Sequence, residues 1–407
     1  MTDPAVLEVA LHDRTIGALT LFPGDQTLFA FDRDYVETAA RPTLSLSFKD
    51  TLGGLITDLR PTRARVPPYF ANLLPEGPLR TYLARKAGVN PRREFFLLRL
   101  LGRDLPGAVA IRPVADAPPL PVEASPSVEQ RPEETLLRFS LAGVQLKFSA
   151  VMEATGGLTV PAEGVGGAWI VKLPSMKFAR VPENEYAMME LARAVGIDVP
   201  EVRLVPLDAI AGLPDDLARM KGHALAVKRF DRSESGAVHM EDFAQVFGLY
   251  PEAKYERANY RNIAEVLWAE TGAEGVAEFV RRLVFNALIG NADMHLKNWS
   301  LLYPDQRRAA LAPGYDFVST IAYLPDTHMA LKLGRSKAMT DLSLERLTYF
   351  AAKAGLPKRL VLDAAQDTTR RFREVWRDGR AVRDISPETV GPIRDLLRRI
   401  PLVGESG

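Results

Sequence analysis

Residues 275–300 read GVAEFVRRLVFNALIGNADMHLKNWS, an apolar run that ends in a polar cluster. From Val276 to Leu288, apolar side chains recur at the three- and four-residue spacing of a helix. Gly290 follows, and glycine can adopt the positive φ that often ends a helix. The stretch therefore predicts a buried helix that delivers four polar side chains into one positioned loop: Asp293, His295, Lys297 and Asn298.

The spacing within this loop is typical of a phosphoryl-transfer site. Asp293 and Asn298 stand five positions apart, as do the proton-accepting Asp and the magnesium-binding Asn of the protein-kinase catalytic loop. Lys297 lies between them, where a cation could neutralise charge developing on a transferred phosphoryl group. Asp316, in GYDFVS, is placed like the metal-binding Asp of an Asp-Phe-Gly motif, with Val318 in place of the glycine. The alternative is that Asp293 and Asn298 are ordinary turn and capping residues.

The composition limits the class of protein. At 407 residues and 47% hydrophobic, the chain can form two or three domains with cores. It has no cysteine, which excludes disulfides and thiolate chemistry, and zinc at Asp293 and His295 would lack a third ligand. The formal charge of +1 gives no overall attraction to nucleic acid. No stretch reads as a signal peptide or membrane span, so we expect a cytoplasmic protein without membrane contact.

The pattern along the chain changes from strands to helices twice. Short alternating runs up to TLSLSF (43–48) predict hairpins of a small sheet, and residues 69–101 have helical spacing. Six prolines in residues 112–132 predict a connection, although a long loop within one domain is the alternative. Strand patterns then surround a helix expected over Glu183–Val195, and from Ser233 onward helical spacing dominates. The predicted division is an N-terminal subdomain (1–112), a proline-rich connection (113–132), a nucleotide-binding N-lobe (133–230) and a helical catalytic C-lobe (231–407).

Two further segments are candidates for holding phosphate groups. Ser140 and Gly143 lie at a predicted strand turn in SLAGVQLKFSAVME, where freed backbone amides could cradle phosphate, although a plain hairpin is the alternative. Lys172 lies in the apolar strand AWIVKLPS, where a buried ammonium needs an anionic partner. Its alternative is an edge-strand lysine that faces water. Glu183 or Glu185 on the following helix could pair with Lys172, and the sequence does not choose between them.

Seven short motifs follow one another along the chain. They are Ser-Leu-Ala-Gly-x-Gln-x-Lys (140–147), Val-Lys-Leu-Pro (171–174), Glu-Asn-Glu-Tyr (183–186), Lys-Arg-Phe-Asp-Arg (228–232), Glu-Asp (241–242) with Gln245, Asp-x-His-x-Lys-Asn (293–298) and Tyr-Asp (315–316). In this order they resemble the motifs of HipA-family kinases, the toxins of type II toxin–antitoxin modules. YFANLLPEG (69–77) is similar to that family's N-terminal subdomain. The resemblance covers nearly the whole chain.

The resemblance implies a fold, cofactors and residue roles. The fold would be α+β, a bilobal protein-kinase-like (HipA-like) fold with a β-rich N-terminal subdomain and a mostly helical C-terminal lobe. The activity would be that of a protein Ser/Thr kinase using ATP and Mg²⁺. By position, the resemblance implies Asp293 as general base, Lys297 as phosphate-facing lysine, Asn298 and Asp316 as magnesium ligands, Lys172 as ATP lysine, Lys228, Arg229 and Phe230 as adenine hinge, Gly143, Gln145 and His295 as further nucleotide contacts, and Ser140 as autophosphorylated serine. His295 is itself expected to orient the loop, and Lys228 stands where the family carries an acidic residue.

Partners are implied in the same way. The resemblance points to growth arrest by phosphorylation of an aminoacyl-tRNA synthetase or another translation component, with a small helix-turn-helix antitoxin (HipB-like) that provides the main contact with operator DNA. Two alternatives stay open: a small-molecule kinase acting on an antibiotic or sugar, and an inactive binding module in a DNA-bound complex. Residues 353–399 hold twelve Lys or Arg against seven Asp or Glu, which predicts a solvated face or an auxiliary DNA contact.

Overall fold

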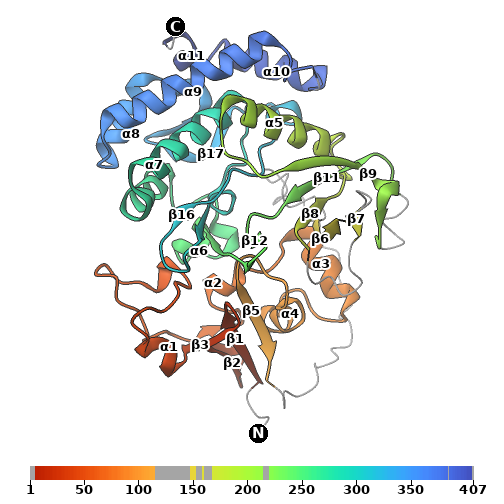
Figure 1. The fold of residues 1–407 in the computed structure, drawn as a ribbon, viewed down its shortest axis with the longest axis vertical. Helices are drawn as coiled ribbons and strands as arrows, with labels where there is room; N and C mark the ends of the chain where they lie inside the picture. The colour runs from red at the N-terminus through yellow and green to blue at the C-terminus, as the bar shows by residue number, and fades with distance from the viewer. Residues whose placement is uncertain are drawn as a thin grey trace. The chain divides into compact units, whose positions relative to one another are not determined.

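The computed structural model describes residues 5–114, 147–152, 158–159, 167–213, 220–383 and 385–405. These residues form two compact units, and Figure 1 shows their helices and strands. Unit 1 comprises Met1–Arg138, Asp231–Lys254 and Leu301–Arg308, and unit 2 comprises Phe139–Phe230, Tyr255–Ser300 and Ala309–Gly407. Unit 1 therefore takes up two segments from the region where we predicted the helical C-lobe. The predicted connection over 113–132 lies almost entirely outside the described residues.

Unit 1 is built on a five-stranded antiparallel sheet in the order β4-β3-β2-β1-β5. This confirms the β-rich start. Helices follow within residues 69–101, also as predicted. The elements of this unit are β1 (Ala5–Leu11), β2 (Arg14–Phe22), β3 (Gln26–Phe31), α1 (Arg33–Glu37), η1 (Leu46–Phe48), β4 (Thr62–Arg63), α2 (Pro68–Ala71), α3 (Gly77–Lys86), α4 (Glu94–Leu101), β5 (Val109–Pro113), β12 (Arg232–Ser233), β13 (Gly236–Ala237), β14 (His239–Asp242), α6 (Phe243–Val246) and η3 (Pro251–Ala253), together with most of β15 (Ser300–Tyr303).

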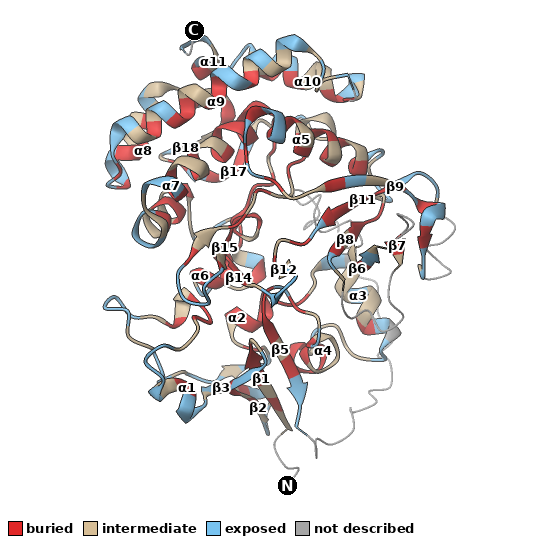
Figure 2. Cartoon of the chain, viewed as in Figure 1, coloured by how far each residue is buried: buried red, intermediate tan, exposed pale blue. Residues whose placement is uncertain are grey.

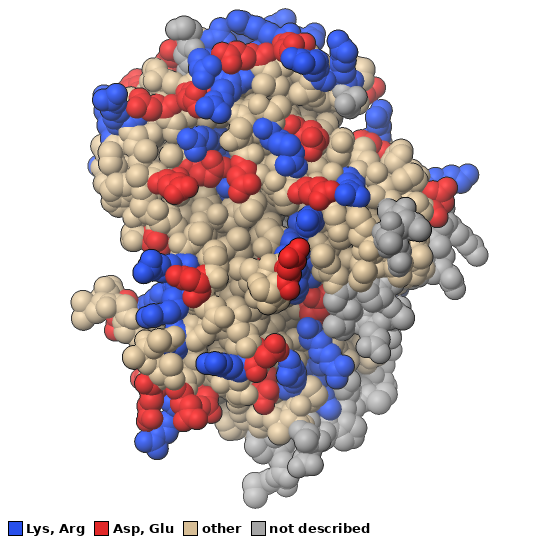
Figure 3. Space-filling model, viewed as in Figure 1, with Lys and Arg blue, Asp and Glu red and all other residues tan. Residues whose placement is uncertain are grey.

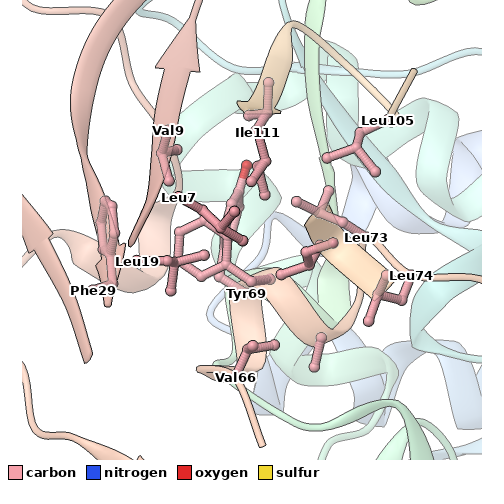
Figure 4. Close-up of a cluster of buried hydrophobic side chains, with 14 of the residues drawn as sticks. Leu7, Val9, Leu19, Phe29, Val66, Tyr69, Leu73, Leu74, Leu105 and Ile111 are labelled. Carbon is pink, nitrogen blue, oxygen red and sulfur yellow. The ribbon is translucent and has the colours of Figure 1, made fainter. Parts of the chain in front are cut away.

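The core of unit 1 lies between this sheet and its helices. Alternate residues of a strand point to opposite faces, so Leu7 and Val9 both reach the core. Figure 4 shows these two side chains and Leu19 packed beside Tyr69 and Leu73 of the helical segment. Each such side chain contributes roughly 1.5–3 kcal/mol when it is fully buried, so this core can hold the sheet without disulfides.

The strand predicted at TLSLSF (43–48) is wrong, because Leu46–Phe48 form a 3-10 helix. A distant acidic side chain fixes this conformation. The Ser45 hydroxyl donates to Glu241 Oε2 at 2.5 Å, and the Leu46 amide donates to Glu241 Oε1 at 2.9 Å. The Leu46 amide is thus held by a side chain far along the chain rather than by a neighbouring strand.

The Glu-Asp motif at 241–242 and Gln245 have a structural role in unit 1. Asp242 caps α6: its carboxylate accepts from the Gln245 amide at 2.9 Å, and the Gln245 side chain accepts from the Asp242 amide at 2.9 Å. Gln245 Nε2 also donates to the Tyr69 carbonyl at 3.1 Å. This reciprocal arrangement is a capping box, which satisfies two backbone donors at a helix start.

Unit 2 contains a six-stranded sheet in the order β10-β7-β6-β8-β11-β9. Only the β10–β7 pair is parallel among the pairings within this sheet. In the antiparallel register of β6 and β8, Lys147 lies directly opposite Lys172. The strands are β6 (Lys147–Met152), β7 (Leu158–Thr159), β8 (Trp169–Lys172), β9 (Val202–Pro206), β10 (Ile210–Ala211), β11 (His223–Lys228), β16 (Ala310–Leu311), β17 (His328–Leu333) and β18 (Ser336–Ala338).

Long helices make up most of the rest of unit 2. The predicted helix before the polar loop is the second half of α7, which bends at Gly272. It packs against α9, whose buried positions from Val361 to Phe372 follow helical spacing. Figure 2 shows buried and exposed residues alternating along α9. Among the described residues, no helix has both the length and the apolarity to cross a bilayer. The helices are α5 (Val181–Val195), η2 (Leu207–Ala209), α7 (Tyr260–Leu288), η4 (Leu296–Asn298), η5 (Thr320–Ala322), η6 (Met339–Asp341), α8 (Leu344–Lys353), α9 (Lys358–Asp378), α10 (Pro387–Leu397) and α11 (Pro401–Glu405).

Gly290 ends this segment with a φ of 68°, as predicted. An added Cβ there would lie 2.5 Å from the Ile321 side chain. Both the backbone angle and the close packing therefore require glycine at the start of the loop.

Candidate active site

Lys172 lies at the centre of a buried charge cluster in unit 2. Only 6% of the residue is exposed, so the water-facing alternative is excluded. Its Nζ lies 2.5 Å from Asp316 Oδ1 and also donates to Glu185 Oε1 on α5. Glu183 instead lies 3.3 Å from the His223 ring. The structure thus selects Glu185 as the glutamate that pairs with Lys172.

The charges in this cluster control each other's protonation. Burial alone would lower the pKa of Lys172, but the charges of Asp316 and Glu185 raise it above its usual value. Burial would likewise raise the pKa of Asp316, but Lys172 and Lys147 hold it well below its usual range. The pKa of Glu185 is raised by burial, which outweighs the attraction of Lys172. Lys172 therefore stays cationic and Asp316 stays anionic near neutral pH.

Asp316 is held in an unusual backbone conformation. Its φ is 61°, which is uncommon for a residue other than glycine. The residues that follow it anchor the segment, since Phe317 packs on Phe285 at 5.3 Å between ring centroids and Val318 packs on Val181. Residues in sparsely populated backbone regions persist only where the surroundings impose them, and they gather at functional sites.

The polar loop after α7 is tied to Asp316 by Asn291, which the sequence analysis missed. Asn291 Oδ1 accepts from the Asp293 amide at 3.0 Å, while its Nδ2 donates to Asn286 Oδ1 at 2.7 Å and lies 3.4 Å from the Asp316 carbonyl. Asn298 Nδ2 donates to the Asp293 carbonyl at 2.9 Å. One network of side-chain amides therefore holds the backbone at Asp293, Asn298 and Asp316.

The Asp293 carboxylate has its own partner, also missed by the sequence analysis. The Tyr255 hydroxyl donates to Asp293 Oδ1, and the Tyr255 ring lies edge-on to the His295 ring, with centroids 4.9 Å apart and planes at 79°. Asp293 and His295 are both buried. The expected role of His295 in orienting the loop therefore has a concrete geometry, since its ring fixes the tyrosine that contacts Asp293.

The predicted hinge lies close to the same segment. The Phe230 ring packs against Tyr315 at 5.5 Å between centroids, and the Tyr315 hydroxyl donates to the Lys297 carbonyl at 2.9 Å. The amides of Lys228 and Arg229 already donate to the carbonyls of Glu201 and Ala168. Lys228 Nζ lies 3.8 Å from Glu201, and Arg229 Nη1 donates to Ser149 Oγ at 3.3 Å. A bound base would therefore use other main-chain groups of this hinge.

Some predicted residues cannot be placed. Ser140, Gly143 and Gln145 lie outside the described residues. Where the structure does describe the chain, it contains no group of three or more Asp, Glu or His side chains that could hold a metal. A metal in this site would need ligands from a bound substrate in addition to Asn298 and Asp316.

A pocket of about 370 Å³ lies in unit 1, apart from these residues. Its lining includes the cations Arg41, Lys49, Arg307 and Arg308 and the carboxylate Asp305, but none of the predicted site residues. The buried cluster of Lys172, Glu185 and Asp316, which carry opposite charges and shifted pKa values, lies in unit 2, and such a cluster is a better marker of a catalytic site than a hollow alone.

The basic excess of residues 353–399 is distributed over paired side chains. Figure 3 shows blue and red side chains intermixed over this helical region on the face in view. Arg370 pairs with Asp367 at 2.6 Å and Glu374 at 2.8 Å, and Arg398 pairs with Asp395 at 3.2 Å. This pattern favours the solvated-face interpretation over a dedicated DNA contact.

Fold and site together define a kinase-like α+β protein, in agreement with the predicted fold class. The chain belongs to the HipA family: residues 139–376 match the model of the HipA-like C-terminal domain, and residues 7–112 match that of the HipA N-terminal domain.

Relatives and a solved structure agree with this assignment. Two Sinorhizobium fredii proteins that carry the name Putative kinase, Y4dM and Y4mE, are 57% and 32% identical to the chain; they cover 92% and 88% of it, over 92% and 87% of their own lengths. The serine/threonine-protein kinase toxin HipA of Shewanella oneidensis is 27% identical over 90% of this chain and 87% of its own length. A structure of the Shewanella oneidensis HipA, HipB and operator DNA complex has a chain that matches with a TM-score of 0.74 at 23% identity, covering 98% of this chain and 96% of that one. This match shows the same fold.

Proposed function

We propose that this chain is an ATP- and magnesium-dependent protein Ser/Thr kinase that acts in the cytoplasm as the toxin of a toxin–antitoxin module. The observation that carries the proposal is the position of Lys172, buried between Glu185 and Asp316, with the Asp293 loop tied to Asp316 through Asn291. A lysine–glutamate pair and a metal-binding aspartate must both be in place for protein-kinase catalysis.

Each residue of the cluster has a proposed task. Asp293 accepts the proton of the substrate hydroxyl, which attacks the terminal phosphoryl group as the bond to the nucleoside diphosphate breaks. Lys172 binds nucleotide phosphates, and Lys297 stabilises the charge on the transferred group. Glu185 holds Lys172 in position.

The residues present fit a magnesium ion that brings phosphate oxygens with it. Asp316 provides a buried carboxylate whose pKa is depressed, so it remains an anionic ligand. The amide nitrogen of Asn298 is fixed on the Asp293 carbonyl, which leaves its side-chain oxygen as the ligand atom. Mg²⁺ is usually bound by one or two protein groups plus substrate phosphates, where it neutralises phosphate charge.

The proposed partners rest on the relatives. The Shewanella oneidensis protein is named a toxin, and the solved structure contains HipB and operator DNA. We therefore propose a HipB-like helix-turn-helix antitoxin that contacts operator DNA. Family behaviour supports an aminoacyl-tRNA synthetase or another translation component as substrate, and Ser140 as the autophosphorylated residue.

The test is phosphoryl transfer by the purified chain with ATP and magnesium, with the phosphate mapped by mass spectrometry. Because a positioned base contributes on the order of 10² to 10⁴ in rate, Asp293→Asn should lose at least a hundredfold while binding ATP normally. Asp363→Asn, on the exposed face of α9, is the matched control and should keep full activity. Normal transfer by Asp293→Asn would overturn the mechanism.

The same assay separates the remaining candidates. No transfer by the wild-type chain, even with its antitoxin partner removed, would support the inactive binding module. Transfer to an aminoglycoside or sugar, with no phosphate on Ser140 or any protein, would support the small-molecule kinase.

A further inference from the structure

We infer that Tyr255 is a positioning residue for the base Asp293, an inference that rests on the proposed function. The hydroxyl of Tyr255 donates a hydrogen bond to the Oδ1 oxygen of Asp293. Asp293 is the residue that must accept a proton from the substrate, so the angle and basicity of its carboxylate matter directly to the chemistry.

The tyrosine that makes this bond is itself fixed. Its ring lies edge-on to the ring of His295, two residues beyond Asp293 in the same loop. Such a contact limits rotation of the tyrosine ring about its own bonds. The hydroxyl therefore meets the carboxylate from one direction, and the carboxylate plane is fixed by the side chain as well as by the loop backbone.

Tyr255 belongs to a segment that holds the loop at a second point. The hydroxyl of Tyr260, which is the first residue of α7, donates to the Met294 carbonyl at 3.1 Å. Asn259 caps α7, with its side chain accepting from the Arg261 and Asn262 amides at 3.0 Å and 3.3 Å. Two tyrosines from residues 255–260 thus reach the same loop, one at the carboxylate of the base and one at its neighbouring backbone.

These two contacts have different consequences for the reaction. The Tyr255 hydroxyl bonds to the carboxylate itself, so it sets the direction in which the oxygens of the base face the substrate hydroxyl. The proton lost by the substrate goes to Asp293, and Tyr255 keeps its own. The Tyr260 hydroxyl instead makes its bonds to the backbone, at Met294 and Leu331.

The experiment compares Tyr255→Phe with Tyr260→Phe in the full chain. The readout is transfer of labelled phosphate from ATP to the chain itself with magnesium, measured as a maximal rate and a half-saturating ATP concentration from pH 5 to 9. In Tyr255→Phe the maximal rate should fall about tenfold at pH 7 with unchanged half-saturation. Tenfold is the size expected for one lost hydrogen bond to an ionised group, and an unchanged half-saturation separates this loss from a general loss of the fold.

Tyr260→Phe is the matched comparison, because it removes a hydroxyl that bonds to the backbone of the same loop rather than to the carboxylate. Its maximal rate should fall less than that of Tyr255→Phe. An unchanged maximal rate in Tyr255→Phe, or an equal fall in both variants, would overturn the inference. If Tyr255→Phe does not fold, 4-aminophenylalanine at position 255 keeps the ring and a weaker donor, so the maximal rate should fall with unchanged half-saturation; a wild-type rate would again overturn the role.

Failure of the inference and failure of the proposed function give different results. If Asp293→Asn retains activity, the base assignment falls and the role of Tyr255 falls with it. If Asp293→Asn is inactive while Tyr255→Phe keeps the wild-type maximal rate, the kinase proposal stands and only the positioning role is lost.

Discussion

Glu241 should make the stability of unit 1 depend on pH, and Glu241→Gln should remove that dependence. The carboxyl group is fully buried and accepts from the Ser45 hydroxyl and the Tyr303 hydroxyl, each at 2.5 Å, and from the Leu46 amide at 2.9 Å. Glutamine has nearly the same shape as the protonated acid. Its oxygen can keep the Tyr303 and Leu46 bonds, and the Ser45 hydroxyl can turn to accept from its amide.

The size of the effect follows from the pKa of Glu241. Burial raises this pKa from 4.5 to about 7, although the three hydrogen bonds oppose the rise. Between pH 4.5 and 7 the folded protein therefore binds a proton that the unfolded chain has released. The contribution of Glu241 to the stability of unit 1 is largest below pH 4.5 and is lost as pH rises through 7, roughly 3 kcal/mol in total. Above pH 7 Glu241 adds no further slope.

Hydrogen exchange in the full chain measures this locally. Amides of residues 45–49 report the opening free energy beside Glu241, after correction for the intrinsic exchange rate at pH 5 and pH 8. The wild-type value should fall by roughly 2–3 kcal/mol between these pH values, while Glu241→Gln should stay flat. Glu234→Gln, at an exposed site of the same unit, should behave like wild type. An equal slope in wild type and Glu241→Gln would refute the reasoning.

Three further outcomes are expected at the proposed active site. Asp316→Asn should weaken magnesium-supported ATP binding as well as turnover, and calorimetry showing unaltered magnesium dependence would exclude the ligand role. Lys172→Met should lower the free energy of unfolding by roughly 3–5 kcal/mol in denaturant titrations, because it leaves Glu185 and Asp316 buried without their cation; an unchanged midpoint would contradict the charge assignment. Ser140→Asp should weaken ATP binding, since a negative group in the proposed phosphate-binding turn would repel the nucleotide, whereas Ser140→Ala should bind ATP normally. Equal affinities would remove the proposed regulation by Ser140.

The parts of the fold that could be predicted are those governed by local patterns. Apolar periodicity located the end of α7, the turn at Gly290 and the strand that carries Lys172. The strand prediction at TLSLSF was wrong because a distant contact overrides the local pattern. Alternation there matches a strand, but Glu241, nearly two hundred residues away in the chain, captures the Leu46 amide and the Ser45 hydroxyl. A single sequence carries no local signal for that bond.

In the candidate site, too, local residue patterns pointed to some residues, while contacts from other parts of the chain could not be predicted. Residue type and spacing selected Asp293, Asn298 and Asp316 as candidates, because the chemistry restricts which side chains can serve. Tyr255 and Asn291 were missed, since tyrosine and asparagine are common residues. Neither stands at a spacing from another polar residue that is typical of a catalytic motif. The one available signal was the position of Asn291 directly after Gly290, where a polar side chain can bond back to the loop that follows.

The buried charges around Lys172 are difficult to explain by stability alone. A buried ion pair loses much of its Coulombic gain to desolvation, and well-packed apolar residues of similar volume would often be as stable. The positive φ of Asp316 adds backbone strain to that free-energy cost. Lys147 lies directly opposite Lys172 in the sheet and brings a second positive charge next to it. These costs fall on residues that the proposed mechanism needs. Since bound nucleotide phosphates would give Lys147 and Lys172 further anionic partners and leave Asp316 free to bind metal, we propose that the cluster is a phosphate-binding site whose carboxylates neutralise its cations until nucleotide binds.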